Sequence, residues 1–203
     1  MVIPLFKSGD INNPSNYRTI IVNPLMGNLF GSMIERRISS WAEYEGKREK
    51  EQVGFRPKHS IIDHHVTLRN LMQKIWYKQG ETTYCCFVDF KKAFDIVSRD
   101  KLRNIMEELG IPNGYRALVQ RLYEKVRAKI RTSEGMSECF GSDIGVKQGC
   151  PLSPTLFGLY IDKLEAWLSN TNGEGVHLEG YVVKLLLYAD DVILISKIGH
   201  GLK

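Results

Sequence analysis

Two adjacent carboxylates near the end of the sequence are flanked on both sides by apolar residues. Asp190 and Asp191 lie between the apolar segments 185–188 and 192–195. Neighbouring carboxylates raise each other's pKa unless a cation neutralises them, so a divalent-cation site is one interpretation. The other is a solvated hairpin turn, because Asp is a common turn residue. The segment lacks the Asn-Gly or Asp-Gly pair that a tight hairpin prefers, so the turn alone does not account for the two acids.

A third carboxylate, Asp89, ends the apolar segment 84–88. If that segment and the hairpin are neighbouring strands of one sheet, three carboxylates converge at one end of it. Such hard oxygen ligands suit Mg²⁺, whose remaining positions are filled by waters and substrate phosphates. Two ions there would activate a hydroxyl nucleophile and hold a leaving pyrophosphate. The hypothesis requires Asp89 to lie within about 10 Å of Asp190, because two such ions are only about 4 Å apart.

The composition is that of a globular protein. The 203 residues carry a net charge of +5, with 43% hydrophobic and 25% charged residues, which excludes a disordered or fibrous chain. This length predicts one domain, or one domain with an additional lobe. No apolar run reaches the ~20 residues of a membrane helix, and the first residues do not have the layout of a signal peptide. We therefore expect an intracellular protein with no membrane partner, without assigning it to nucleus or cytoplasm.

The four cysteines show no spacing typical of a zinc site or a disulfide framework. Cys85 and Cys86 lie in the apolar segment that precedes Asp89, where small buried thiols are expected. We expect no disulfide-linked partner. The sequence does not indicate an oligomeric state.

Hydrophobic periodicity predicts an α+β fold in which helices and strands are mixed and the last strands are antiparallel. A first amphipathic helix is expected between Leu25 and Gly46, with an apolar face made of Leu25, Leu29, Met33, Ile38 and Trp41. Further elements are expected as helices over 102–109, 118–126 and 153–168, a buried strand over 83–90, a hairpin from 185–188 and 192–195, another that begins at 129–132, and short extended pieces around a turn within 1–23.

A second amphipathic helix is expected after residue 60. Ser60 and Asp63 resemble a capping box, with Asp in place of Glu. Gly80 would end this helix. Its apolar face would include Ile61, Leu68, Met72, Ile75 and Trp76.

Five short motifs follow one another along nearly the whole chain. One alone would be a weak signal, because Asp-Asp pairs are common. As a set in this order, they closely resemble the reverse transcriptases of non-LTR (LINE-type) retrotransposons. The motifs are Asn16-Tyr-Arg-Thr-Ile20, Gln52-Val-Gly-Phe-Arg56, Phe87-Val-Asp-Phe-Lys-Lys-Ala-Phe-Asp95, Gln148-Gly-Cys-Pro-Leu-Ser-Pro154 and Tyr188-Ala-Asp-Asp191.

The resemblance implies the fingers and palm of a right-hand polymerase, an α+β fold in which helices flank an antiparallel palm sheet. Residues 1–203 would form a partial reverse transcriptase domain, with fingers roughly over 1–80 and palm, with interleaved fingers elements, over 81–203. The chain ends shortly after Asp191. The resemblance therefore implies that primer grip and thumb are absent, and we expect the truncated chain to be inactive alone.

The resemblance also implies roles for the acids. Asp89, Asp190 and Asp191 match the three palm carboxylates, with Asp89 and Asp190 as principal ligands of two Mg²⁺ ions and Asp191 in support. Mn²⁺ is the alternative metal. Asp95 matches a position without a metal role, and we interpret it as a structural cap or turn residue.

Three basic residues match nucleotide-binding positions of the family. Arg18 matches the arginine that meets the triphosphate, for which a guanidinium fork is suited. Lys7 would assist it, although a solvated surface lysine is an equal interpretation. Arg56 resembles a fingers residue near template or nucleotide. Thr19 stands where the family usually has proline, and the loss of a fixed φ is expected to loosen the segment that carries Arg18.

Three further residues match positions around the nucleotide. Phe94 matches the aromatic gate that excludes a 2′-hydroxyl and so favours deoxynucleotides; the alternative is a plain core phenylalanine. Gln148 and Gly149 match a loop that touches nucleotide and template, since glycine allows close approach of the backbone. The alternative places both in a loop before a helix cap.

The resemblance implies an RNA-directed DNA polymerase that transfers dNTPs to the 3′-hydroxyl of a DNA primer on an RNA template. The alternative is a catalytically silent nucleic-acid-binding remnant of a retroelement. The charge of +5 fits that alternative modestly. The intact aspartates argue against it, because clustered carboxylates hinder the binding of a polyanion unless metal is present.

Overall fold

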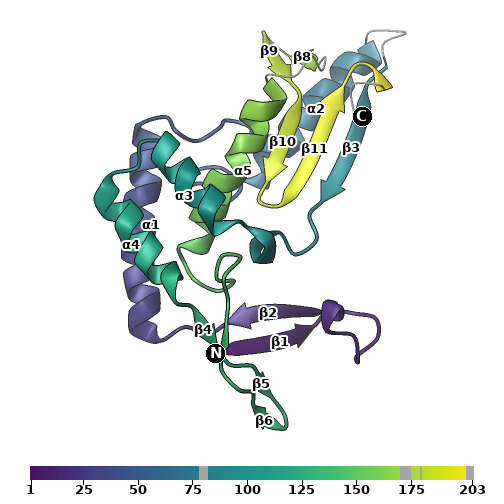
Figure 1. Cartoon of the computed structure of the whole chain (residues 1–203). Coiled ribbons are helices and arrows are strands. Elements are labelled where there is room, and N and C mark those ends of the chain that lie inside the picture. Colours follow the sequence, from purple (N-terminus) through teal and green to yellow (C-terminus); the bar gives the residue numbers. More distant parts are fainter. Residues whose placement is uncertain (78–81, 170–174, 179, 200–203) are drawn as a thin grey trace. The chain divides into compact units, whose positions relative to one another are not determined.

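The computed structural model describes the chain apart from three short gaps and the last residues (Figure 1). Among the described helices, none is long and apolar enough to cross a membrane. The chain divides into two compact units, each built from two stretches of sequence. The described residues are 1–77, 82–169, 175–178 and 180–199. The first unit comprises 1–41 and 92–157, and the second 42–91 and 158–203.

The first unit combines helices with short antiparallel hairpins. Its elements are β1 (Val2–Phe6), η1 (Pro14–Asn16), β2 (Tyr17–Ile21), most of α1 (Leu25–Tyr44), η2 (Ala93–Ile96), α3 (Arg99–Glu108), α4 (Asn113–Glu124), β4 (Arg127–Ala128), β5 (Arg131–Thr132), β6 (Gly135–Met136), β7 (Phe140–Gly141) and the start of α5 (Ser153–Ser169). β1 pairs with β2, β4 with β7, and β5 with β6. The β5–β6 pair confirms the hairpin predicted to begin at 129–132.

The second unit is built around a three-stranded antiparallel sheet of order β10-β11-β3 (Figure 1). Its elements are the end of α1, α2 (Ile61–Tyr77), β3 (Tyr84–Asp89), the rest of α5, β8 (Val176–Leu178), β9 (Tyr181–Val183), β10 (Leu185–Tyr188) and β11 (Asp191–Ser196). β8 and β9 form a separate hairpin. The predicted hairpin of β10 and β11 is therefore confirmed.

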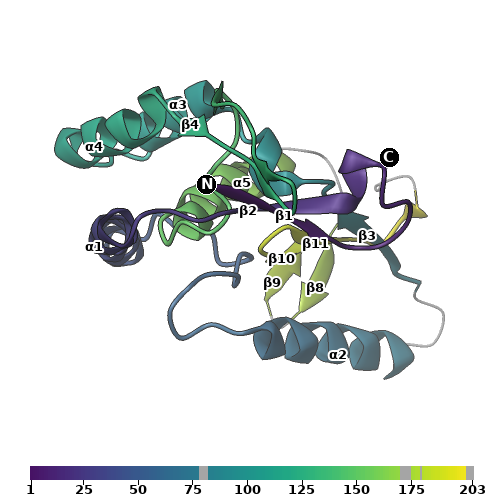
Figure 2. The ribbon, with the colours of Figure 1, turned by 90° about the horizontal axis from the view of Figure 1, so that it is seen from below.

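Helix α2 covers one face of this sheet and closes the core of the second unit (Figure 2). Leu71 of α2 packs with Val176, Leu186 and Ile195, all of them buried. These side chains come from the helix, from β8 and from the two strands of the hairpin. The core therefore fixes the hairpin against α2.

The predicted cap of α2 is confirmed. The backbone N–H of Ser60 donates to Asp63 Oδ2 at 3.0 Å, and the N–H of Ile62 donates to Ser60 Oγ at 3.2 Å. Aspartate therefore serves in the capping box in place of glutamate. Gly80, which was predicted to end this helix, lies outside the described residues.

The apolar faces predicted for α1 and α2 are partly wrong. In α1, Ile38 is buried as predicted, together with Ile34, Ser39 and Ala42. Leu25 is 83% exposed, and Leu29 and Met33 are exposed as well. In α2, Leu68 packs against the core as predicted, whereas Met72 and Trp76 are exposed. Steps of three to five residues fit more than one face of a helix, and packing selects among them.

The prediction that the strand before Asp89 is buried is also wrong. Among the described strands, only β11 pairs with β3, so β3 is an edge strand. Phe87 is 72% exposed and Cys85 is exposed, while Cys86 is half-buried. An apolar composition predicts a strand, but it does not show whether the strand has neighbours on both sides.

Replacing Leu71 with Ala should lower the free energy of unfolding by about 2–5 kcal/mol, because it opens a cavity between α2 and the sheet. Leu71 is 1% exposed, whereas its neighbour Met72 is 63% exposed. Met72→Ala should therefore change stability by less than about 0.5 kcal/mol. Denaturant titration of both variants measures the difference. Equal losses would contradict the packing of α2 described above.

Candidate functional site

The three predicted aspartates lie at one end of the β10-β11-β3 sheet. Asp89 and Asp191 are directly opposite each other in the β3–β11 pair, and Asp191 also pairs with Tyr188 across the hairpin. Asp190 precedes Asp191 in the hairpin turn. Opposite Cα atoms in antiparallel strands are about 4.5–5.5 Å apart, and consecutive ones about 3.8 Å. The Cα atoms of Asp89 and Asp190 are thus at most about 9 Å apart, as the predicted convergence requires.

The carboxylates of these aspartates are open to solvent. Asp89 and Asp191 are exposed, and Asp190 is half-buried. Within the described ranges, no lysine or arginine forms an ion pair with any of the three. Hard oxygen donors that lack a protein cation are the ligand type that Mg²⁺ and Mn²⁺ take, so the residues present fit a divalent ion. Their role as ligands stays a prediction.

The turn that carries Asp190 has an unusual backbone. Ala189 and Asp190 form a two-residue connection, and Ala189 has φ +58°, in the left-handed region. Glycine is preferred at such a position because a side chain is strained there. Ala189 is nonetheless buried, and the side chain of Gln52 bonds to its backbone. The sequence places Gln52 in a motif but indicates no role for it, because only the fold brings it next to the backbone of Ala189.

The guanidinium of Arg56 is already bonded to other residues of this chain. Its Nε and Nη2 donate to the two carboxylate oxygens of Glu43 at 2.8 and 2.7 Å, and its Nη1 donates to the carbonyls of Glu49 and Gln52. The Arg56 guanidinium holds the pKa of Glu43 below its ordinary value. The side chain of Arg56 is only 8% exposed. A contact with nucleotide or template would first have to break this ion pair.

Arg18 and Lys7, the other predicted basic residues, lie on the first hairpin of the first unit. Arg18 is an exposed residue of β2 opposite Leu5, and the exposed Lys7 follows the end of β1. Thr19, which follows Arg18, forms a hydrogen bond with the side chain of Asp95. Burial raises the pKa of Asp95 above its ordinary value, and Lys92, Thr19 and Lys7 oppose this rise. The residue that replaces proline is therefore held by a hydrogen bond to Asp95, and this contact fits a structural role for Asp95.

The loop of Gln148 and Gly149 is joined to the same β-hairpin. The N–H of Ile21, at the end of β2, donates to the carbonyl of Gln148 at 2.7 Å. Gly149 has φ +105°, and a Cβ there would lie 2.6 Å from the Ile21 carbonyl oxygen. Only glycine allows this approach. Within the first unit, the strand that carries Arg18 and the predicted nucleotide loop are thus neighbours.

Phe94 is half-buried and stacks on Phe157, with ring centroids 4.7 Å apart and planes 12° apart. Both residues belong to the first unit. The contact fits the core interpretation of Phe94, and it also holds the ring in one orientation, as a gate would require. The structure by itself does not assign the gate.

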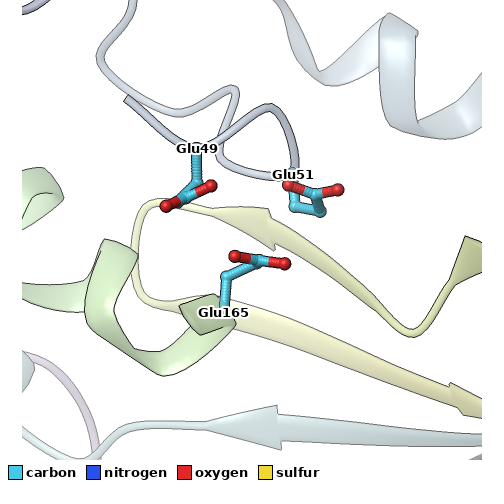
Figure 3. A group of neighbouring side chains, drawn as sticks. All are labelled: Glu49, Glu51 and Glu165. Atoms are coloured by element: carbon cyan, nitrogen blue, oxygen red, sulfur yellow. The ribbon is translucent and has the colours of Figure 1, made fainter. Parts of the chain in front are cut away.

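A second carboxylate group, which sequence reasoning missed, lies elsewhere in the second unit (Figure 3). The side chains of Glu49, Glu51 and Glu165 point toward one another. Each offers one carboxylate oxygen, and these three oxygens lie within 4.8 Å of one another. Burial, followed by the charge and hydrogen bond of Glu165, raises the pKa of Glu49 to about 7. Glu49 therefore holds a proton for part of the time at neutral pH. No signal connected Glu165 with the other two, which are far away in sequence.

Residues 7–202 match the family model described as reverse transcriptase (RNA-dependent DNA polymerase). The chain belongs to the reverse transcriptase family. Two similar proteins are Retrovirus-related Pol polyproteins from R2 retrotransposable elements, R2DM of Drosophila melanogaster and R2 of Popillia japonica, each 28% identical over 97% and 94% of this chain. These matches confirm the resemblance to non-LTR reverse transcriptases. The chain spans 18% and 26% of the length of these two relatives.

Solved telomerase structures share the fold of this reverse transcriptase. Telomerase from Candida albicans, in complex with the TWJ fragment of telomeric RNA, matches 100% of this chain and 39% of its own with a TM-score of 0.62. The corresponding complex from Candida tropicalis matches 98% and 37% with a TM-score of 0.64. Both are 14% identical. The α+β fold of polymerase fingers and palm is therefore as predicted.

Glu49→Gln should remove a pH dependence of stability. The folded-state pKa of about 7 lies above the ordinary 4.5, so the folded chain holds more protons than the unfolded chain between these values. The stability of the wild type should therefore fall as pH rises from 4.5 to 7. Glu49→Gln cannot ionise at residue 49, so its stability should not fall in this window, and it should be more stable than the wild type at pH 8. Denaturation midpoints between pH 4.5 and 8 measure it, with the exposed Glu45→Gln as control. Parallel profiles for Glu49→Gln and wild type would contradict the assignment.

Proposed function

We propose that this chain is the polymerising part of an RNA-directed DNA polymerase, which adds dNTPs to the 3′-hydroxyl of a DNA primer on an RNA template. The observation that carries the proposal is the strand register that sets Asp89 opposite Asp191, with Asp190 in the adjoining turn. Family membership supports it, because the same chain matches the reverse transcriptase model over nearly its whole length.

In this proposal Asp89 and Asp190 hold two Mg²⁺ ions, and Asp191 supports them. When bound, such ions lower the pKa of the attacking hydroxyl and neutralise charge on the pyrophosphate. The chain's own contribution is to keep the oxygen donors of three aspartates at one end of a sheet. Since the described residues provide no cation to these acids, their charge stays available to a metal.

We assign contacts with the nucleotide to the β1–β2 hairpin and to the loop beside it. Arg18 is exposed on β2, and its guanidinium suits phosphate oxygens, so we assign it to the triphosphate with Lys7 in support. Gln148 and Gly149 lie beside the end of the same strand, because the missing Cβ of Gly149 lets their loop approach the Ile21 carbonyl. We assign this loop to contacts with nucleotide and template.

Phe94 would discriminate against a 2′-hydroxyl. Its stacking on Phe157 restrains the ring, and a restrained bulky ring excludes an additional oxygen more effectively than a mobile one. Arg56 is the least supported of the nucleotide-binding residues, because its guanidinium is already bonded to Glu43 and two carbonyls.

RNA is the proposed template because the chain shares the reverse transcriptase family and the telomerase fold. Template and primer would be held mainly through phosphates, in line with the net charge of +5. Binding should therefore weaken steeply as salt is raised. The relatives are much longer than this chain, so additional contacts from outside it would strengthen binding in a whole protein.

Asp190→Asn should abolish Mg²⁺-dependent addition of one dNTP to a DNA primer annealed to RNA. The truncated chain is expected to be inactive under ordinary turnover conditions, because it would hold the duplex weakly. The test therefore uses single-turnover conditions at low salt with the chain in excess, so that duplex binding does not limit the reaction. We expect activity to fall by more than about a hundredfold. Replacing a residue that only orients a metal ligand already lowers activity about 10–100-fold, and the loss of a ligand itself should cost more. The control is Asp100→Asn, an exposed acid of α3 that pairs with Arg103. Activity retained by Asp190→Asn would contradict the proposal.

The catalytically silent alternative has a separate signature. A chain that only binds nucleic acid should retain an RNA–DNA hybrid equally well in Mg²⁺ and in EDTA. A polymerase with three open carboxylates should bind the hybrid more weakly in EDTA, because the uncompensated acids repel phosphates. Metal-independent binding together with no dNTP addition by the wild type would favour the alternative.

A further inference from the structure

The aspartate turn adopts a conformation that its own sequence does not favour. Ala189 has φ +58° at the first central position of a two-residue turn. Glycine is the residue that takes this conformation without strain, and alanine does not. A turn of this kind persists only when surrounding groups hold it. Something outside the hairpin must therefore restrain Ala189, and with it Asp190.

Gln52 provides this restraint in the second unit. Its Oε1 accepts from the N–H of Ala189 at 3.1 Å, and its Nε2 donates to the carbonyl of the same residue at 3.3 Å. The Gln52 side chain is fully buried at 0% exposure. One amide group thus satisfies both backbone groups of the strained residue. Oε1 also accepts from the N–H of Gly54 at 2.7 Å, which fixes the amide in turn.

The backbone around Gln52 is fastened to the strand before the turn. The N–H of Leu187 donates to the carbonyl of Glu51 at 2.9 Å, and the N–H of Val53 donates to the carbonyl of Leu187 at 3.1 Å. His64 of α2 contacts the same Leu187 carbonyl at 2.8 Å through Nε2. Gln52 is therefore held at a defined distance from Ala189.

Gly54 makes this approach feasible. A Cβ at residue 54 would lie 2.2 Å from the backbone nitrogen of Ala189, closer than any side chain can come. The spacing of Gln52 and Gly54 in the motif thus has a physical explanation. The glutamine holds the turn, and the glycine leaves room for it.

We propose that Gln52 is a positioning residue for the metal-binding carboxylates: its buried amide holds Ala189 in the left-handed conformation that sets Asp190 beside Asp89 and Asp191. The inference rests on the proposed function for its catalytic meaning, while the restraint itself is a property of the fold. Gln52 touches neither metal nor substrate in this proposal. It acts through Ala189 alone.

The test compares Gln52→Met with the wild-type chain. This variant keeps the length of the side chain and removes its three hydrogen bonds, two to Ala189 and one to Gly54. One readout is hydrogen exchange of the Ala189–Asp191 amides, and the other is Mn²⁺ affinity from the electron paramagnetic resonance signal of the free ion. We expect faster exchange at the turn and an affinity about tenfold lower, the usual range for a group that orients a metal ligand. Ser196→Ala is the control, because it removes a buried hydroxyl of β11 away from the aspartates.

A compensating variant separates positioning from simple core packing. Glycine at residue 189 adopts φ +58° without strain, so adding Ala189→Gly to Gln52→Met should restore much of the Mn²⁺ affinity. A core-packing role predicts no such rescue. If Gln52→Met does not fold, Gln52→Glu takes its place. A neutral carboxyl at residue 52 both accepts and donates a hydrogen bond, as the amide does, so the Mn²⁺ affinity of this variant at pH 6 should approach that of the wild type.

The outcomes are distinguishable. Unchanged exchange at the turn in Gln52→Met, or no rescue by Ala189→Gly when affinity has fallen, overturns the role of Gln52. Wild-type Mn²⁺ binding that Asp190→Asn does not reduce overturns the proposed metal site instead. In that case faster exchange at the turn still supports Gln52 as its restraint.

Discussion

The pairing of β11 with β10 on one side and β3 on the other is the constraint on which the candidate site depends. Side chains alternate between the faces of a strand, so a slip of one residue would move Asp191 away from Asp89 and onto the opposite face. The register is protected by burial on both faces of β11. Ile195 packs in the core that includes α2, and Val192, which faces the other side of the strand, is 2% exposed. The core therefore aligns the acids, although it lies away from them.

The same unit contains a segment, residues 48–56, in which the polar side chains of Arg48 and Gln52 are buried. Arg48 Nε bonds Asp162 Oδ2 at 2.7 Å, with side chains 1% and 7% exposed. Among the described residues, the terminal nitrogens of Arg48 have no partner, and Gly158 leaves space for one of them. Burial raises the pKa of Asp162, against the effect of Arg48. Such a pair contributes little net stability, but it specifies one arrangement, because breaking it would leave a buried charge.

The sequence predicted the order of elements, the hairpin and the meeting of three aspartates, because these follow from local periodicity and from motifs that are contiguous in the chain. It did not predict which faces are covered. Phe87 and Leu25 belong to apolar segments and are exposed, since burial depends on neighbours that periodicity does not identify. Gln52 belongs to one of the five motifs, yet its role depends on the φ angle of Ala189. Nothing in an Ala-Asp pair indicates that the alanine adopts a left-handed conformation.

The two carboxylate groups of the second unit differ in burial and in spacing. Glu49, Glu51 and Glu165 are half-buried and lie close together, and the pKa of Glu49 rises to about 7, so a proton relieves their repulsion. Asp89 and Asp191 are exposed at the end of the sheet, where water screens their charges. A metal ion binds deprotonated ligands, so a cation at the glutamates must first displace the proton of Glu49. At neutral pH this competition weakens the glutamates as a site for a divalent ion, although they are the more tightly clustered group.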